Sequence, residues 1–321
     1  MQSFEQLLQQ FEKSFNKRHF PSEPASLYDS SQYILGIGGK RVRPVMCLMG
    51  NELFDDIQSD AWEVGTAIEL FHNFSLIHDD IMDAAPLRRG VPTVHANFGT
   101  NTAILAGDVM LIMCYEYLNK VQTAYKGKII ALFNKTALEV SEGQQLDMDF
   151  ERRAYVSFSE YKKMIELKTS VLLAASLKMG AIIGGASAGN ASHLYEFGRN
   201  LGIAFQVQDD YLDAFGDPER FGKQVGGDIL ANKKTFLMIH ALEHASGAEK
   251  ELLVSLMQTN PPDKVEKVLN IFRNVGVNEW ALKLKKDYLE KAFEHLESIA
   301  VSSYRKEPLE QLAHFLIQRD H

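Results

Sequence analysis

The sequence predicts an all-α protein, a single bundle of long helices around a central cleft. Three observations predict it: apolar residues recur at helical spacing along most of the 321 residues, no proline lies between Pro92 and Pro218, and no Ser-rich or charge-block linker interrupts this pattern. The chain is 45% hydrophobic and 24% charged, which suits a globular protein with a large core. We therefore expect one domain over residues 1–321.

The composition also argues against several classes of protein. The net charge of −8 gives no electrostatic footprint for a nucleic-acid partner. Cys47 and Cys114 lack metal or redox spacing, so we expect small buried thiols in a reducing compartment. Charged residues interrupt the first 20 positions, and no window reaches the roughly 18 apolar residues that span a bilayer. We expect no signal peptide, no transmembrane segment and a cytoplasmic location.

The first elements follow from spacing and turn residues. Residues 2–17 form an amphipathic helix, and Ser26 is a candidate N-cap for a helix over Leu27–Leu35. Gly36–Gly39 ends that helix, and Pro44 suits the first turn of the next one. A long helix then covers residues 59–83.

The middle and the end of the chain read as further helices. Four apolar residues after the loop with Pro92 form one stripe, which we expect to be core, with its upper part as a possible cavity lining: Leu105, Val109, Ile112 and Met113. Lys168 and Thr169 start or bend a helix just before the apolar run Val171–Leu177. Gly184–Gly189 lacks the strand and lysine of a phosphate-binding P-loop, so it is a helix connection. Residues 236–321 show helical patterns only.

The long helix over 59–83 ends in three carboxylates, Asp79, Asp80 and Asp83. On a helix, side chains four residues apart share a face, so Asp79 and Asp83 point the same way and repel. Mg²⁺ is bound by one or two carboxylates and completes its shell with water and substrate phosphates. A solvated helix end is the plainer explanation, but the apolar run Phe74–His78 leads directly into the cluster.

A second cluster weakens that plainer explanation. Asp209, Asp210 and Asp213 repeat the spacing Asp-Asp-x-x-Asp and again close an apolar segment. Two such clusters on separate helices could face each other across a cleft and hold metal ions against one polyanion. Basic residues lie near both, at Lys40–Arg43, at Arg88 and Arg89, and after the second cluster.

At this point the sequence resembles the trans-isoprenyl diphosphate synthases, also called polyprenyl synthetases. The resemblance rests on the paired DDxxD motifs, on Arg-Arg-Gly-x-Pro-Thr from Arg88, and on Gly-Lys-Arg-x-Arg-Pro from Gly39, and it covers Gly38 to Lys234. It implies the isoprenoid synthase fold, a homodimer, and a magnesium-dependent prenyltransferase of isoprenoid biosynthesis. Such an enzyme joins isopentenyl diphosphate to a dimethylallyl, geranyl or farnesyl diphosphate.

The resemblance also implies the roles of individual residues. The diphosphate of isopentenyl diphosphate would be bound by Lys40, Arg43, His72 and Arg89, with Arg41 as a further candidate. The allylic diphosphate would meet Arg88, Lys168, Thr169, Lys223 and Lys233, and Gln206 would be a further substrate-binding residue. In the middle segment Gly143–Asp149, Gln144 and Asp147 would face the cleft. Ala231-Asn232 replaces the usual Glu-Gly before Lys233, and Asn tolerates the left-handed conformation that Gly would supply.

Metal binding and catalysis follow from the same resemblance. Three Mg²⁺ ions would be held by the six carboxylates of the motifs, Asp79, Asp80, Asp83, Asp209, Asp210 and Asp213. Asp79, Asp83, Asp209, Lys168 and Arg88 would be catalytic, because they would stabilise the departing diphosphate.

Product length should depend on side chains one and two turns before the first cluster. The growing chain would meet Phe74 and Ser75, and then Phe71. A bulky Phe74 beside a small Ser75, with no insertion inside the DDxxD motif, resembles short-chain enzymes. We therefore expect the twenty-carbon geranylgeranyl product, with fifteen-carbon farnesyl diphosphate as the alternative.

Four other readings stay open. A terpene cyclase would normally replace the second motif with an Asn-Ser-Glu pattern, and a catalytically silent subunit would have lost metal ligands. A di-iron bundle needs two Glu-x-x-His motifs, of which only Glu69–His72 is plausible. A metal phosphohydrolase built on His78 and Asp79 would leave the second cluster unexplained.

Overall fold

The computed structural model describes residues 1–216 and 225–318, and nearly all of its regular structure is helical, which confirms the all-α prediction. The chain divides into two compact units. Unit 1 consists of Met1–Lys135, Ala175–Tyr195 and Ile299–Pro308, and unit 2 of Thr136–Ala174, Glu196–Ser298 and Leu309–His321. Whether they form one domain around a cleft stays a prediction.

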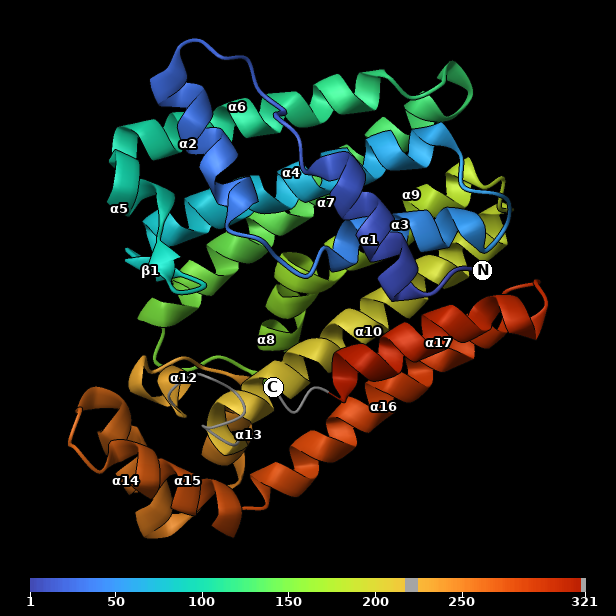
Figure 1. Ribbon diagram of the computed structural model, residues 1–321. Helices are drawn as coiled ribbons and strands as arrows, with labels where there is room; N and C mark the ends of the chain where they lie inside the picture. The colour runs from blue at the N-terminus through green and yellow to red at the C-terminus, as the bar shows by residue number, and fades with distance from the viewer. Residues whose placement is uncertain (217–224, 319–321) are drawn as a thin grey trace. The chain divides into compact units, whose positions relative to one another are not determined.

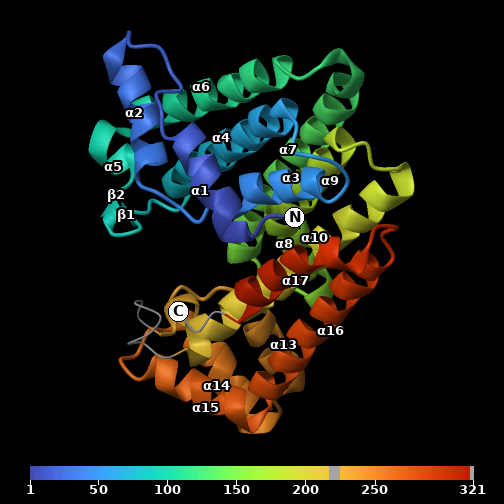
Figure 2. The same ribbon diagram turned by 45° about the vertical axis from the view of Figure 1, so that its right-hand side comes forward.

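Unit 1 is built on α4, the long helix that carries the first Asp motif. Its elements are α1 (Phe4–Phe15), α2 (Ala25–Gly36), α3 (Val42–Glu52), α4 (Ser59–Met82), β1 (Leu87–Arg88), β2 (Val91–Pro92), α5 (Val94–Phe98) and α6 (Thr100–Asn119). Helix α4 packs along α6 and against α3, while α2 covers α6 and α1 covers α3 (Figure 1). The two short strands form a hairpin beside α5 (Figure 2).

The amphipathic start of the chain folds as its pattern predicts. Helix α1 begins with a capping box, in which Ser3 and Gln6 each accept a hydrogen bond from the other's backbone N–H. Its apolar face is buried, with Phe11 and Phe15 stacked at 5.2 Å between ring centroids. The predicted N-cap at Ser26 is wrong: α2 begins at Ala25, two residues before the predicted start at Leu27, and its N-cap Pro24 makes no side-chain hydrogen bond.

The prediction that Leu105, Val109, Ile112 and Met113 form a core stripe is also wrong. Leu105 is 55% exposed and Ile112 is 61% exposed, whereas α6 buries a face of smaller residues that includes Ala103, Ala106 and Cys114. Met110, Tyr117 and Leu118 are buried on α6 as well, so the predicted stripe lies on a different face of the helix from its buried residues. Apolar spacing alone could not distinguish these two faces, because α6 is hydrophobic on both.

Unit 2 holds the second Asp motif and most of the C-terminal half. Its own elements are α8 (Phe158–Ile165), η1 (Glu166–Ser170), α12 (Gly227–Leu230), α13 (Phe236–His244), α14 (Gly247–Gln258), α15 (Lys264–Asn274) and α16 (Val277–Glu297). Four helices continue from one unit into the other: α7 (Thr123–Arg152), α9 (Val171–Ile183), α10 (Ala188–Phe215) and α17 (Ser303–Ile317). Helix α13 packs on α8, α15 and α16.

Other local predictions can be compared directly. The helix predicted over residues 59–83 is α4, with Asp83 as its C-cap, and Gly184–Gly189 spans the connection between α9 and α10 as predicted. Lys168 and Thr169 do bend the helical path, because they lie in the wide π turn η1 between α8 and α9.

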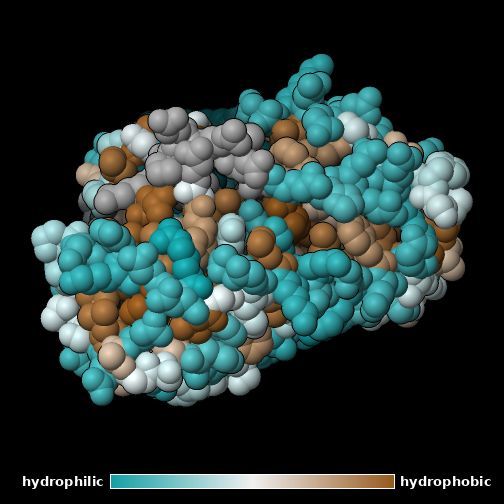
Figure 3. Space-filling model, turned by 90° about the horizontal axis from the view of Figure 1, so that it is seen from below, coloured by the Kyte–Doolittle hydropathy of each residue, from teal (hydrophilic) through white to brown (hydrophobic). Residues whose placement is uncertain are grey.

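Within the described ranges, no helix combines the length and the apolar character that crossing a membrane requires. The face shown in Figure 3 is largely hydrophilic, with hydrophobic residues visible between the polar ones.

Candidate active site

The first Asp motif lies at the C-terminal end of α4, and its three carboxylates differ in their surroundings. Asp80 is buried and accepts two hydrogen bonds from Arg88, at 2.8 Å from Nε and 2.7 Å from Nη2. Asp79 is farther from the same Nη2, at 3.4 Å, and Asp83 is exposed at the C-cap. Burial lowers the pKa of Arg88, but the hydrogen bonds and charge of Asp80 outweigh it, so this pKa is raised. Arg88 therefore already neutralises Asp80.

A tight hairpin aims the two arginines in different directions. Leu87 pairs with Pro92 and Arg88 with Val91, so Arg89 and Gly90 form a two-residue loop. Both have positive φ, 53° and 81°, as a type I′ turn requires. Arg88 turns toward the Asp motif, and Arg89 donates a hydrogen bond to the carbonyl of Gly38.

The basic loop before α3 is organised by Arg41, which points inward. Arg41 adopts φ 47° at the N-cap of α3, donates to the carbonyl of Leu35 at 2.8 Å, and forms a buried ion pair with Glu69 at 2.5 Å. Asn73 also donates to Glu69, at 3.1 Å. Arg41 thus anchors the loop, whereas Lys40 is exposed and Arg43 is half-buried.

Arg43, Arg89 and His72 form the candidate site for isopentenyl diphosphate in unit 1. Arg43 Nη1 donates to His72 Nε2 at 3.2 Å. Burial and the neighbouring Arg43 hold the pKa of His72 well below its ordinary value, so the ring is neutral and accepts this hydrogen bond. Burial lowers the pKa of Arg43 to about 10, and burial with the nearby Arg88 also lowers the pKa of Arg89. The cluster carries more positive than negative charge, as an anion site should.

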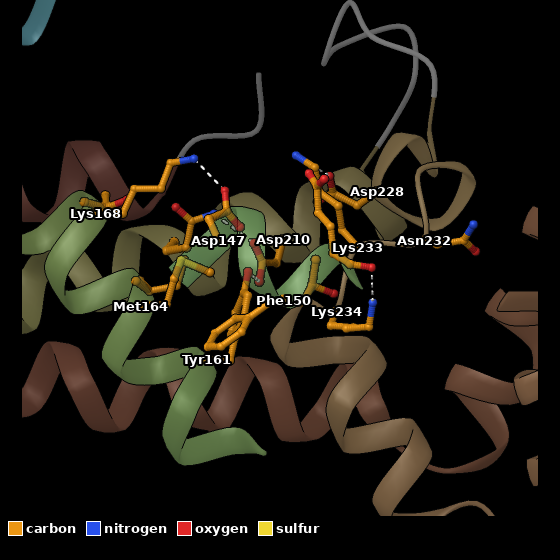
Figure 4. A pocket seen from close by; sticks show the side chains of 15 residues that line it. Asp147, Phe150, Tyr161, Met164, Lys168, Asp210, Asp228, Asn232, Lys233 and Lys234 are labelled. Carbon is orange, nitrogen blue, oxygen red and sulfur yellow. Dashed lines mark hydrogen bonds and ion pairs between the residues drawn. The ribbon is translucent and has the colours of Figure 1, made fainter. Parts of the chain in front are cut away.

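Unit 2 contains a separate polar cavity of about 220 Å³ around the second Asp motif. Figure 4 shows Lys168 and Asp147 at one side, Asp228 and Lys233 at the other, and Asp210 with Tyr161 between them. Lys168 Nζ lies 2.6 Å from Asp147 Oδ2, and Thr169 and Gln206 also line the cavity. The predicted residues Lys168, Thr169, Gln206, Asp210 and Lys233 therefore come together; Lys223 lies outside the described residues.

Asp210 is the most enclosed carboxylate of the second motif. It accepts hydrogen bonds from Gln206 Nε2 at 2.9 Å, from Tyr161 Oη at 3.2 Å and from the Phe236 backbone N–H at 3.3 Å. Burial, together with the charges of Asp228 and Asp209, raises its pKa to about 8 despite these hydrogen bonds. Burial and Asp228 also raise the pKa of Asp213. The carboxylates of this cavity repel one another, which a cation would relieve.

The basic segment after the second motif is partly described. Asn232 has φ 56°, which confirms that it adopts the left-handed conformation expected at this position. Lys233 Nζ lies 3.5 Å from Asp228 Oδ1, and the backbone N–H of Asp228 donates to Asp213 at 3.0 Å. Asp228 thereby links the lysine to the second motif.

The donor chemistry fits Mg²⁺ bound together with a diphosphate. Among residues 1–216 and 225–318, no three acidic, histidine or cysteine side chains converge on a point that could hold a metal. Mg²⁺ does not need such a cage, because substrate phosphates and water supply most of its ligands. The role of Asp80 and Asp210 as direct ligands stays a prediction, and each would have to exchange hydrogen bonds that it makes now.

The three residues expected to set product length lie on α4. Phe71 is buried and packs edge-on against Phe133, with ring centroids 5.3 Å apart. Phe74 and Ser75 are half-buried, and the Phe74 ring lies 4.8 Å from that of His78. Phe71 thus belongs to the core of unit 1, and Phe74 and Ser75 are more accessible.

The geometry excludes one alternative and adds residues that the sequence did not single out. Glu69 and His72 are engaged by Arg41 and Arg43, so they cannot act as a di-iron Glu-x-x-His pair. The missed residues are Tyr161 and Asp228. Asp228 follows Gly226-Gly227 directly after the basic loop, a spacing that could have drawn notice, whereas Tyr161 sits in an ordinary amphipathic pattern.

Comparisons with known proteins identify the family of this chain. The family model described as polyprenyl synthetase matches residues 24–275. The short chain isoprenyl diphosphate synthase of Methanothermobacter thermautotrophicus is 40% identical over 299 residues, covering 93% of this chain and 92% of the relative. The geranylgeranyl diphosphate synthase of Saccharolobus solfataricus is 38% identical over 314 residues, covering 96% and 93%.

A solved structure extends the agreement to the fold. A crystal structure of geranylgeranyl pyrophosphate synthase superposes with a TM-score of 0.95 at 42% identity, covering 99% of each chain. The isoprenoid synthase fold predicted from the motifs is thereby confirmed. Because the family match covers residues 24–275, which include both Asp motifs and the lysines of the cavity, this chain belongs to the polyprenyl synthetase family.

Proposed function

We propose that the protein is a magnesium-dependent trans-prenyltransferase that condenses isopentenyl diphosphate with an allylic diphosphate to geranylgeranyl diphosphate. One observation carries the proposal: in unit 1 the neighbouring Arg43 and Arg89 have lowered pKa values, and in unit 2 burial and neighbouring carboxylates raise the pKa of Asp210. A diphosphate with its Mg²⁺ ions brings both charges that these sites lack. The relatives named as geranylgeranyl synthases support the twenty-carbon product.

The residues of unit 1 would bind isopentenyl diphosphate. Arg43 and Arg89 present guanidinium groups suited to bidentate phosphate contacts, and the exposed Lys40 adds a third cation. Neutral His72 holds Arg43 in place and can donate through its other ring nitrogen. The interior Arg41 would act on this site through the loop backbone, and not by touching the substrate.

The residues around the cavity of unit 2 would bind the allylic diphosphate. Lys168 and Lys233 would neutralise phosphate oxygens once they leave Asp147 and Asp228, and the Thr169 hydroxyl would donate beside them. Three Mg²⁺ ions, the number that the resemblance implies, would be held by Asp79, Asp83, Asp209 and Asp213 and would stabilise the leaving diphosphate. The double bond of isopentenyl diphosphate then attacks the allylic carbon, and loss of a proton restores the alkene.

A homodimer fits the exposed apolar stripe of α6. Ile104, Leu105, Ile112 and Tyr115 lie on one side of this helix, and all are more than a third exposed. A patch of this kind is typical of a protein interface. A cytoplasmic location is supported by Cys47 and Cys114, which are both buried free thiols.

Incubation with isopentenyl diphosphate, MgCl₂ and each allylic starter in turn tests the function. We expect diphosphate release and a geranylgeranyl product by mass spectrometry, and neither when EDTA replaces MgCl₂. A product that stops at farnesyl diphosphate would favour the alternative. A hydrocarbon formed from farnesyl or geranylgeranyl diphosphate alone would indicate a terpene cyclase, and no product with any starter would indicate a silent subunit.

A further inference from the structure

The helical path of unit 2 widens where it carries Lys168 and Thr169. Residues Glu166–Ser170 form the π turn η1, between α8, which ends at Ile165, and α9, which begins at Val171. Isolated π turns are rare within helices and occur frequently at functional sites. Something outside the turn must therefore hold it.

On one side the turn is held by α7. Gly143 comes so close that a Cβ atom there would overlap the Lys168 backbone nitrogen and would lie 2.7 Å from its Cα. One helical turn farther along α7, Asp147 forms its 2.6 Å ion pair with the Lys168 ammonium group. Gly143 and Asp147 lie on the same face of the helix, so the backbone contact and the ion pair act on the same residue.

On another side the turn is held by α10. A Cβ atom at Gly202 would lie 2.7 Å from both Cα and Oγ of Ser170, the last residue of the turn. Ser170 is completely buried, so it has no open space into which it could withdraw. Two helices thus contact the middle and the last residue of the turn that carries Lys168 and Thr169, each through a residue without a side chain.

We propose that Gly143 and Gly202 are positioning residues, which clamp the π turn and thereby direct Lys168 and Thr169 into the cavity of unit 2. The proposal deepens the proposed function, because it assumes that this cavity takes the allylic diphosphate. Added volume at either glycine would displace the turn. Shifts of about 1 Å in a binding group can lower rates by about 100-fold.

Helix propensity alone predicts that alanine at either glycine would stabilise the protein and would not displace the turn. Both glycines lie inside helices, where replacement by alanine is normally favourable. Each helix offers a matched control, because a Cβ at Gly127 of α7 or Gly189 of α10 would have nothing within 4 Å. Gly127→Ala and Gly189→Ala should therefore leave the protein unchanged or slightly more stable.

Steady-state kinetics of Gly143→Ala test the clamp against a purely structural role. We expect the KM for the allylic diphosphate to rise about 10- to 100-fold, while the KM for isopentenyl diphosphate stays at the wild-type value. Hydrogen exchange should become faster in peptides covering residues 164–172, and Gly127→Ala should match the wild type in both measurements. Equal changes in both KM values, or none relative to Gly127→Ala, would overturn the proposal.

A second pair of variants covers the case in which Gly143→Ala does not fold. Gly202→Ala should weaken binding of inorganic diphosphate in the presence of MgCl₂, and adding Ser170→Gly should restore part of it, because that change removes the Oγ and Cβ atoms of Ser170. Absence of rescue, or a Gly189→Ala variant as impaired as Gly202→Ala, would contradict the clamp. Hydrogen exchange needs no turnover, so it decides the clamp even if the wild type transfers no prenyl group.

Discussion

The two acidic motifs share one sequence pattern but lie in opposite electrostatic surroundings. In unit 1, Arg88 holds Asp80 in a forked pair, and Arg43 and Arg89 lie nearby with lowered pKa values. In unit 2, Asp210 has neutral hydrogen-bond donors, and neighbouring carboxylates help burial to raise its pKa to about 8. The arginines of the first region therefore suit an anion, and the carboxylates of the second suit a cation.

This difference explains why one motif is not enough to define the chemistry. Acidic triplets are chemically identical in sequence, but what surrounds them decides whether they are neutralised by protein or by ligand. Under the proposed function, isopentenyl diphosphate would suit the arginines of unit 1, and the Mg²⁺ ions of the allylic diphosphate would suit the carboxylates. Variants that remove charges from unit 1 or from unit 2 test this difference.

The largest effect on stability is expected at the buried pair of unit 1. Arg41→Met leaves the charge of Glu69 buried without its partner, which should lower the free energy of unfolding by about 3–5 kcal/mol. Urea denaturation would measure it. Lys286→Met, which breaks the exposed Lys286–Glu290 pair, is the control and should cost only about 0.3–0.5 kcal/mol.

The double variant Arg41→Met/Glu69→Leu sharpens this test. It removes both charges, so it should recover much of the stability that Arg41→Met loses. If Arg41→Met lowers the free energy of unfolding no more than Lys286→Met does, this ion pair does not organise the basic loop before α3.

The next effect is catalytic. Asp79→Ala removes a carboxylate proposed to bind Mg²⁺ and should lower kcat by about 10²–10³-fold, the usual loss for one preorganised electrostatic element. The thermal midpoint should barely move, because Asp79 lies near the exposed end of α4. Asp56→Ala, at an exposed acidic residue outside the motifs, is the control. Retention of most prenyl transfer by Asp79→Ala would contradict its assignment.

Unit 2 should lose stability as the pH rises from acid to neutral. The pKa of Asp210 is raised to about 8 from 3.8, so the stability that its protonated form contributes is fully present below the unfolded value and is lost as the pH rises to about 8. The midpoint of the metal-free protein should fall between about pH 4 and pH 8 and then level off, and Asp210→Asn should flatten that fall. Added MgCl₂ should reduce it as well. A midpoint that is constant over this range would show that the carboxylates are not in conflict.

Unit 1 should show the opposite dependence of stability on pH, with a loss as the pH falls. The pKa of His72 lies well below 6.5 because burial and Arg43 disfavour its charged form. Its contribution to stability is therefore present above about pH 6.5 and lost as the pH falls. His72→Gln should reduce the acid sensitivity of the midpoint, measured by circular dichroism. If it instead changes the alkaline side, the two regions do not differ as described.

Local patterns predicted much of the fold but little of these surroundings. The end of α4 at the Asp motif and the left-handed Asn232 follow from short-range chemistry, so the sequence was sufficient for both. The partners of Asp80 and Arg41 depend on which residues meet after folding, and the spacing of residues in the sequence does not predict these contacts. The apolar face of α6 was assigned to the core for the same reason, since periodicity cannot say which of two apolar faces is covered.

The site shows the same limit. The motifs identified Lys168 and Asp210, but not that Lys168 lies in a π turn or that Tyr161 and Phe236 enclose Asp210. Those contacts join residues far apart in the chain. They were out of reach of any argument from neighbouring residues.

The smallest expected effect concerns product length and compares two rings on α4. Phe74 is half-buried, so Phe74→Ala should open space without a large loss of stability and should shift the products toward longer chains by mass spectrometry. Phe71→Ala should act differently, because Phe71 is buried against Phe133 and its removal should cost about 3–5 kcal/mol. An unchanged product profile for Phe74→Ala would refute the role of Phe74 in limiting product length. A longer product from Phe71→Ala alone would show that Phe71, one turn earlier on α4, limits product length instead.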